Sequence, residues 1–79
     1  MRTVTLYTRA GCHLCDDAAA ELERLQAEMA FVVDAVDIET DDALFKRYLE
    51  RIPVIALDGE ELSDFFVDVA ALRHKLPPR

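Results

Sequence analysis

The 79-residue sequence contains two cysteines, few basic residues and no long apolar run. The two cysteines allow only one intramolecular disulfide, so the chain cannot be a scaffold held together by several cross-links. No stretch approaches the roughly 18 apolar residues of a membrane-spanning helix. The first residues lack the apolar region and the cleavage site of a signal peptide. We therefore expect a cytoplasmic protein, in which a cysteine pair is more often catalytic or metal-binding than structural.

Basic residues are scarce beside acidic ones: nine Lys and Arg stand against sixteen Asp and Glu, for a net charge of −7. Binding to nucleic acid requires cations that neutralise phosphates, so we expect no nucleic acid partner. The same argument speaks against an anionic membrane surface. A basic protein partner would instead be attracted to the domain.

Apolar residues make up 52% of the chain, which is enough to form a core. No internal repeat, linker or low-complexity segment divides the sequence. We expect one domain over residues 1–79, acting as a monomer. Pro77-Pro78 stops the last helical pattern, and residues 77–79 are expected to form a loose tail.

Hydrophobic patterning predicts a strand, a helix and a second strand in the first half of the chain. Residues 3–8 alternate between apolar and polar side chains, as in a strand. From Cys12 or His13 to about residue 29, apolar residues recur at helical steps, and the predicted buried face consists of Leu14, Ala18, Leu22, Leu25 and Met29. Residues 31–38 are rich in β-branched side chains and predict a strand parallel to the first, because a helix connects the two.

The second half predicts a helix, a hairpin and a last helix. Residues 40–42, Thr-Asp-Asp, are typical of a helix start. Asp58-Gly59 between two apolar segments indicates a hairpin over residues 53–62 with a two-residue turn of type I′. Ser63 or Asp64 is the expected cap of the last helix, whose buried face would hold Phe65, Val69, Leu72 and Leu76. The predicted order is β-α-β-α-β-β-α, an α/β fold.

The two cysteines lie where the first predicted helix begins, as Cys12-His13-Leu14-Cys15. A disulfide that closes so short a loop contributes only roughly 2 kcal/mol, against about 4.7 kcal/mol for a hundred-residue loop, so it suits a bond that forms and breaks. Unpaired backbone N–H groups and the helix dipole stabilise a thiolate at this position. Cys12 is the expected attacking thiol, and Cys15 would resolve the mixed disulfide.

Other interpretations of the cysteine pair stay open. Both cysteines can be ordinary small core residues. A metal site would need two more ligands, and His74 lies near the far end of the chain. His13 can lend positive charge or shuttle a proton, or it can be a solvated loop residue.

The cysteine pair after the first strand and the proline that opens the third resemble the thioredoxin fold in its glutaredoxin-like form. Residues 6–15 look like the glutaredoxin active-site segment, and residues 52–55, Ile-Pro-Val-Ile, resemble the strand that begins with a cis-proline. The likeness spans about residues 3 to 76 and is greatest to short bacterial glutaredoxin-like relatives. Two departures stand out: His13-Leu14 replaces Pro-Tyr, and residues 63–66, Ser-Asp-Phe-Phe, replace a Gly-Gly pair followed by an aspartate.

The resemblance implies a four-stranded mixed sheet with helices on both faces, and a thiol–disulfide oxidoreductase. The substrate would be a disulfide-bearing protein or a small thiol compound. No cofactor would be required, and glutathione is a possible, weakly bound reductant. The alternative is a non-catalytic thioredoxin-fold binding module whose cysteine pair is vestigial or carries a metal.

The resemblance also implies roles for residues around the pair. Arg9 and Arg51 would flank the site, with Arg9 facing the glycyl carboxylate of glutathione. A cis Pro53 would bring the backbone beside the cysteines, so that the Ile52 main chain pairs with an extended substrate. Asp64, at the start of the last helix, would take the place of the γ-glutamyl carboxylate and weaken glutathione binding.

Overall fold

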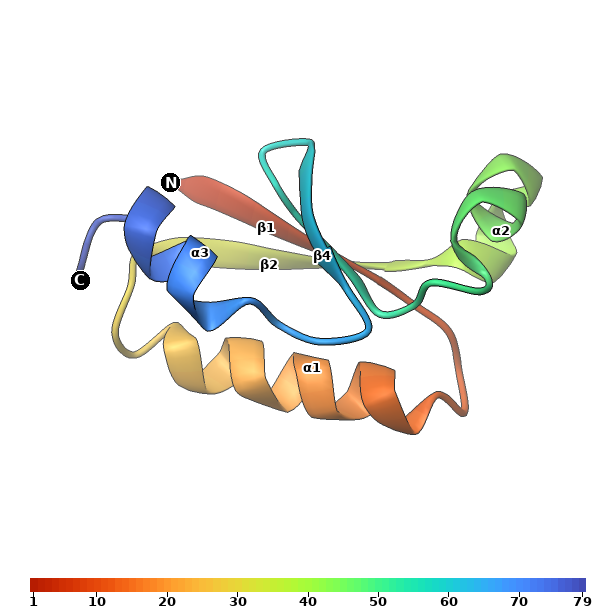
Figure 1. Cartoon of the computed structure of the whole chain (residues 1–79), viewed down its shortest axis with the longest axis horizontal. Helices are drawn as coiled ribbons and strands as arrows, with labels where there is room; N and C mark the ends of the chain where they lie inside the picture. The colour runs from red at the N-terminus through yellow and green to blue at the C-terminus, as the bar shows by residue number, and fades with distance from the viewer.

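The computed structural model describes residues 1–79 and has the element order predicted from the sequence (Figure 1). The strands and helices are β1 (Arg2–Thr8), α1 (His13–Leu25), β2 (Phe31–Asp37), a 3₁₀ turn (Ile38–Thr40), α2 (Asp42–Tyr48), β3 (Val54–Leu57), β4 (Glu60–Asp64) and α3 (Val69–Lys75). Asp41 caps α2 at the predicted helix start, because its carboxylate accepts hydrogen bonds from the backbone N–H groups of Ala43 and Leu44.

The four strands form one mixed sheet in the order β2-β1-β3-β4. β1 is parallel to β2, as the intervening helix requires, and antiparallel to β3. β3 and β4 form the predicted hairpin, in which Asp58 and Gly59 have φ of 49° and 89°. Positive φ at both central residues is the requirement of the type I′ turn, which confirms the interpretation of Asp58-Gly59.

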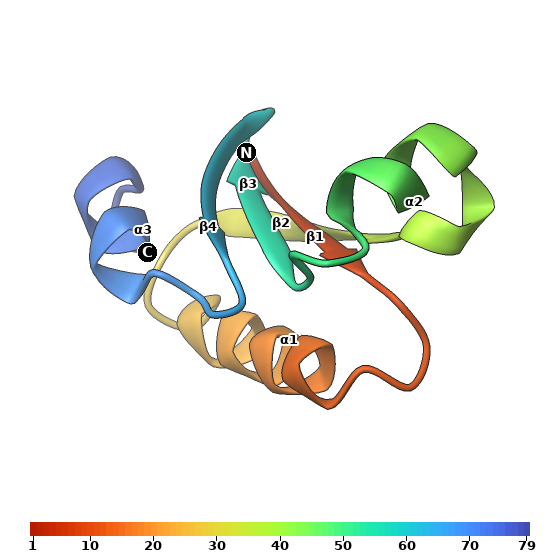
Figure 2. The ribbon, with the colours of Figure 1, turned by 45° about the vertical axis from the view of Figure 1, so that its right-hand side comes forward.

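Alternating side chains of β1 and β3 build two apolar clusters, one on each face of the sheet. Leu6 and Ile55 belong to the larger cluster, which α1 and α3 cover. Tyr7 and Val54 point to the opposite face, where they pack with residues of α2. Figure 2 shows α2 on the other side of the sheet from α1. Helices on both faces complete the thioredoxin-like architecture.

The segment after β4 differs from the sequence-based expectation. Ser63 and Asp64 do not cap the last helix: they continue β4, where they pair with Ile55 and Val54. The cap of α3 is Asp68, whose carboxylate accepts a hydrogen bond from the Ala71 N–H. Pairing with β3 keeps the chain extended through residue 64, so the helix begins later than its hydrophobic pattern indicates.

The C-terminal residues are not the loose tail that was expected. Pro78 forms a bridge with Met29, and the Arg79 N–H donates to the Glu28 carbonyl at 2.8 Å. The Arg79 side chain donates to the Gln26 carbonyl at 2.6 Å. The last residues thus satisfy carbonyl groups of the turn that follows α1.

None of the helices combines the length and the apolar character needed to cross a membrane.

Candidate active site

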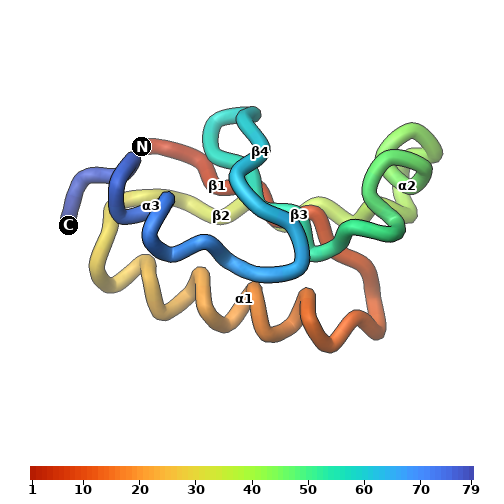
Figure 3. The backbone as a smooth tube through the Cα atoms, viewed as in Figure 1, coloured from red at the N-terminus to blue at the C-terminus, as the bar shows by residue number.

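Three strand ends bring the candidate site together. Tyr7 of β1 pairs with Val54 of β3, and Val54 pairs with Asp64 of β4. The segments after β1, before β3 and after β4 therefore leave the sheet at the same end. Figure 3 shows the last two of these segments side by side, near the N-terminal turn of α1.

The cysteine pair begins α1. Cys12 is the N-cap residue, in extended conformation, and its Sγ accepts a hydrogen bond from the Cys15 N–H at 3.1 Å. The two residues form a disulfide, with a Cα–Cα distance of 5.2 Å. Cys15 is 1% exposed, whereas Cys12 is partly exposed. Only one residue of the pair, Cys12, is thus open to another molecule, and it lies at the positive end of the helix dipole.

Pro53 follows a cis peptide bond, as the resemblance implied, and its side chain is fully buried. The neighbouring backbone is largely occupied: the Ile52 N–H donates to the Tyr48 carbonyl at 3.1 Å, and the Pro53 carbonyl accepts from the Phe65 N–H at 2.8 Å. The donor half of the expected pairing between Ile52 and an extended substrate is therefore taken. The Ile52 carbonyl accepts no backbone hydrogen bond within the chain.

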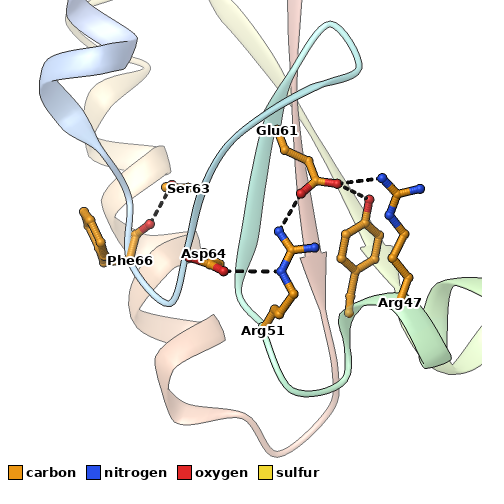
Figure 4. A network of polar contacts seen from close by, with 7 residues as sticks. Arg47, Arg51, Glu61, Ser63, Asp64 and Phe66 are labelled. Atoms are coloured by element: carbon orange, nitrogen blue, oxygen red, sulfur yellow. Dashed lines mark hydrogen bonds and ion pairs between the residues drawn. The ribbon is translucent and has the colours of Figure 1, made fainter.

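Arg51 lies beside Pro53 but points toward β4. Its guanidinium contacts Glu61 at 2.5 Å and Asp64 at 3.3 Å (Figure 4). The second Glu61 oxygen accepts from Arg47 and from the Tyr48 hydroxyl, each at 3.0 Å. Arg51 thus ties the segment before β3 to β4.

This network shifts the pKa values of Glu61 and Tyr48. The hydrogen bond from Arg51 lowers the pKa of Glu61, and the hydrogen bond from the Tyr48 hydroxyl acts in the same direction. Burial raises the pKa of Tyr48, and its hydrogen bond to Glu61 raises it further. Both shifts favour the state in which the carboxylate is charged and the phenol is neutral.

Arg9 and His13 lie on the two sides of Cys12 in the sequence but make different contacts. The Arg9 guanidinium is 3.5 Å from the Glu39 carboxylate and 5.4 Å from the ring centre of Phe45. His13 is the exposed first residue of α1. No group of three or more His, Cys, Asp and Glu side chains is arranged to hold a metal ion.

A glutaredoxin-like family model matches residues 3–77, nearly the whole chain; its description is Glutaredoxin-like domain (DUF836). The chain belongs to this family.

Among curated proteins, this glutaredoxin-like chain is similar to Uncharacterized protein Rv0508 of Mycobacterium tuberculosis, with 36% identity over 75 residues. The alignment covers 89% of this chain and 77% of that protein. Uncharacterized protein Mb0520 of Mycobacterium bovis matches with the same identity and coverage.

Solved structures agree with the fold. Protein Ne2328 of Nitrosomonas europaea is 31% identical, with a TM-score of 0.86 over 96% of this chain and 92% of that one. Protein XcR50 of X. campestris is 42% identical, with a TM-score of 0.67 over 90% and 91% of the two chains. A thioredoxin mutant from Halobacterium salinarum, at 23% identity and a TM-score of 0.64 over 92% and 69%, supports the fold alone.

The glutaredoxin-like site contains exposed apolar residues that the sequence pattern placed in the core. Leu14, between the cysteines, is 54% exposed, and Phe65 is 51% exposed. Phe65 has φ of 69°, a left-handed conformation that bulky side chains rarely adopt. The sequence did contain a signal for this unusual backbone: residues 63–66 replace the Gly-Gly pair of the glutaredoxin pattern. Glycine adopts a left-handed conformation without strain.

Replacing Glu61 with Gln is expected to lower the unfolding free energy by about 1–2 kcal/mol at neutral pH, because charge-assisted hydrogen bonds are lost. A carboxylate with a lowered folded pKa contributes stability above its unfolded pKa and loses it as pH falls through the folded value. The difference between wild type and variant should therefore shrink as pH falls below the ordinary glutamate value of 4.5. Urea unfolding from pH 7 to pH 3 measures this difference.

Glu60→Gln is the matched control, because Glu60 is an exposed neighbour that is 3.4 Å from Lys75. Its replacement should change the unfolding free energy by less than about 0.5 kcal/mol. A Glu61→Gln penalty that stays constant down to pH 3 would contradict the proposed role of the charged carboxylate.

Proposed function

We propose that this protein is a thiol–disulfide oxidoreductase that reduces or exchanges disulfides of a protein or small-molecule substrate. The observation that carries the proposal is the unequal exposure of a bonded cysteine pair at a helix start. Cys12 is partly exposed and Cys15 is 1% exposed. An accessible attacking thiol with a shielded partner behind it is the arrangement that stepwise disulfide exchange requires.

In the reduced protein, the Cys12 thiolate attacks one sulfur of the substrate disulfide. A mixed disulfide forms, and the other substrate sulfur leaves as a thiolate that takes up a proton. The Cys15 thiolate then attacks Cys12 Sγ and releases the second substrate thiol. Two electrons have passed to the substrate, and the protein ends with its Cys12–Cys15 disulfide.

Local contacts support Cys12 as the thiolate. The Cys15 N–H donates to Cys12 Sγ at 3.1 Å, and a hydrogen bond to an ionised acceptor is stronger than one to a neutral acceptor. The N-terminus of α1 adds the positive end of the helix dipole. Asp16, exposed in the first turn of α1, opposes both with its negative charge.

The proposal includes surroundings and partners. We place the protein in the cytoplasm as a monomer, with no nucleic acid or membrane partner and no required cofactor. A thiol such as glutathione returns the pair to the reduced state by the reverse exchange. In this proposal the bound substrate lies beside Arg9, His13 and the backbone of residues 51–53, where the Ile52 carbonyl is available to pair with it.

Cys12→Ser is expected to abolish disulfide reduction, because the serine hydroxyl does not form a disulfide. The measurement is the rate of insulin reduction with excess dithiothreitol, compared with dithiothreitol alone, and the same comparison with a glutathione mixed disulfide. Wild type should accelerate both reactions and Cys12→Ser neither. If wild type is as inert as the variant, the protein is instead a thioredoxin-fold binding module.

A further inference from the structure

The apolar residues that the fold leaves exposed are concentrated beside the disulfide. The large exposed apolar side chains are Met1, Leu14, Val32, Phe65 and Phe66. Leu14, Phe65 and Phe66 line one groove on the surface of α1, with a volume of about 270 Å³. Leu14 directly precedes Cys15 in the chain, so one end of this aromatic groove lies a single residue away from the disulfide, although neither cysteine lines it.

The backbone that presents the aromatic residues is fixed by hydrogen bonds. The Phe65 N–H donates to the Pro53 carbonyl at 2.8 Å and to the Arg51 carbonyl at 3.3 Å. The Ser63 hydroxyl donates to the Phe66 carbonyl at 2.8 Å (Figure 4). A bulky residue with positive φ is strained and persists only where the surroundings hold it. Phe65 and Phe66 thus stay exposed to water on a segment held by hydrogen bonds, although the Phe65 backbone is strained.

The rim of the groove is negatively charged. Its charged residues are Asp17, Glu21 and Arg24, two acids and one base. Glu21 is paired with Arg24, so Asp17 remains without an ion-pair partner. Asp16 adds a second exposed carboxylate next to it. If an occupant buries an apolar side chain in the groove, a basic residue next to that side chain would lie beside these carboxylates.

We infer that the aromatic groove binds an extended polypeptide segment of the disulfide substrate, in which an apolar and a basic residue flank the reacting cysteine. The inference rests on the proposed function and names its substrate class. Charge complementarity argues for this occupant: the chain carries a net charge of −7, and the unpaired carboxylate lies on the rim. Glutathione has no apolar side chain and is itself anionic, so it fits this groove poorly.

The test uses fully reduced protein and three mixed disulfides of thionitrobenzoate. One carries a short peptide with Phe and Lys beside its cysteine, the second a matched peptide with Ser and Glu there, and the third 2-mercaptoethanol. Thionitrobenzoate is the better leaving group, so its release reports the attack by Cys12 in a stopped-flow experiment. The Phe/Lys peptide is expected to react about tenfold faster than the Ser/Glu peptide, as burial of part of a phenylalanine side chain predicts.

Phe66→Ser should reduce this tenfold preference to about twofold, since it removes the most exposed wall of the groove. Asp17→Asn should slow the reaction of the Phe/Lys peptide and leave the reaction of the 2-mercaptoethanol compound unchanged. Val32→Ser is the matched control, because Val32 is 44% exposed on β2 and pairs with Thr3 at the far end of the sheet. It should leave the preference unchanged.

The outcomes separate the two proposals. If none of the three compounds reacts, the proposed oxidoreductase function fails, and the inference fails with it. If all three react at similar rates in wild type and in Phe66→Ser, the function stands and the inference is overturned. A wild-type dimer in sedimentation that Phe66→Ser converts to monomer would assign the groove to a second copy of the chain, which also overturns the inference.

Discussion

Cys15→Ser is expected to lower insulin turnover by at least about 100-fold while leaving Cys12 able to attack. The Cys15 sulfur lies within bonding distance of its partner, at a Cα–Cα separation of 5.2 Å. An intramolecular thiol in this geometry acts at an effective concentration far above that of a millimolar external thiol. Without it, the mixed disulfide waits for solvent thiol. Initial rates measure the loss, and intact mass spectrometry after incubation with glutathione disulfide should show one adduct per chain.

Cys12→Ser is the control for this trap. It retains only Cys15, which is 1% exposed and so cannot meet a disulfide in solution. Neither turnover nor an adduct is expected. If Cys12→Ser forms the adduct as fast as Cys15→Ser, the assignment of Cys12 as the attacking residue is wrong.

The parts of the fold that could be predicted depend on local signals. The turn at Asp58-Gly59 needs positive φ at both residues, and the sequence offers residue types that adopt it. The helix that begins at Asp42 follows a capping aspartate. The cysteine pair marks the start of α1 in the same way. Each of these features depends on residues that are neighbours in the chain, so the sequence alone is enough to predict it.

The parts that could not be predicted depend on contacts between distant segments. Asp64 looked like a helix cap, but its pairing with Val54 keeps it in β4, and its carboxylate binds Arg51. Phe65 fitted a helical stripe, yet it follows the end of β4 directly and is half exposed. Hydrophobic periodicity records which side chains recur, and it does not record where a strand partner ends the pairing. The aromatic groove was missed for this reason.

Leu22→Ala is expected to cost about 3–4 kcal/mol of unfolding free energy, because it leaves a cavity in the core. Leu22 is 0% exposed and packs in the larger cluster between α1 and the sheet. A chain of this length has a total stability of about 4–12 kcal/mol, so the variant loses a large share of it. The midpoint of thermal unfolding should fall by roughly 15–25 °C. Circular dichroism of the oxidised proteins measures both, with the disulfide intact throughout.

Leu14→Ala makes the same chemical change in the same helix and isolates the effect of burial. Both substitutions alter helix propensity alike, but Leu14 is 54% exposed in the aromatic groove. Its loss should cost less than about 0.5 kcal/mol. The helical pattern alone gives the two leucines the same place on the buried face, so their measured difference decides between that pattern and the structure. Equal costs would mean that Leu14 is packed in the core and that the aromatic groove is closed in solution.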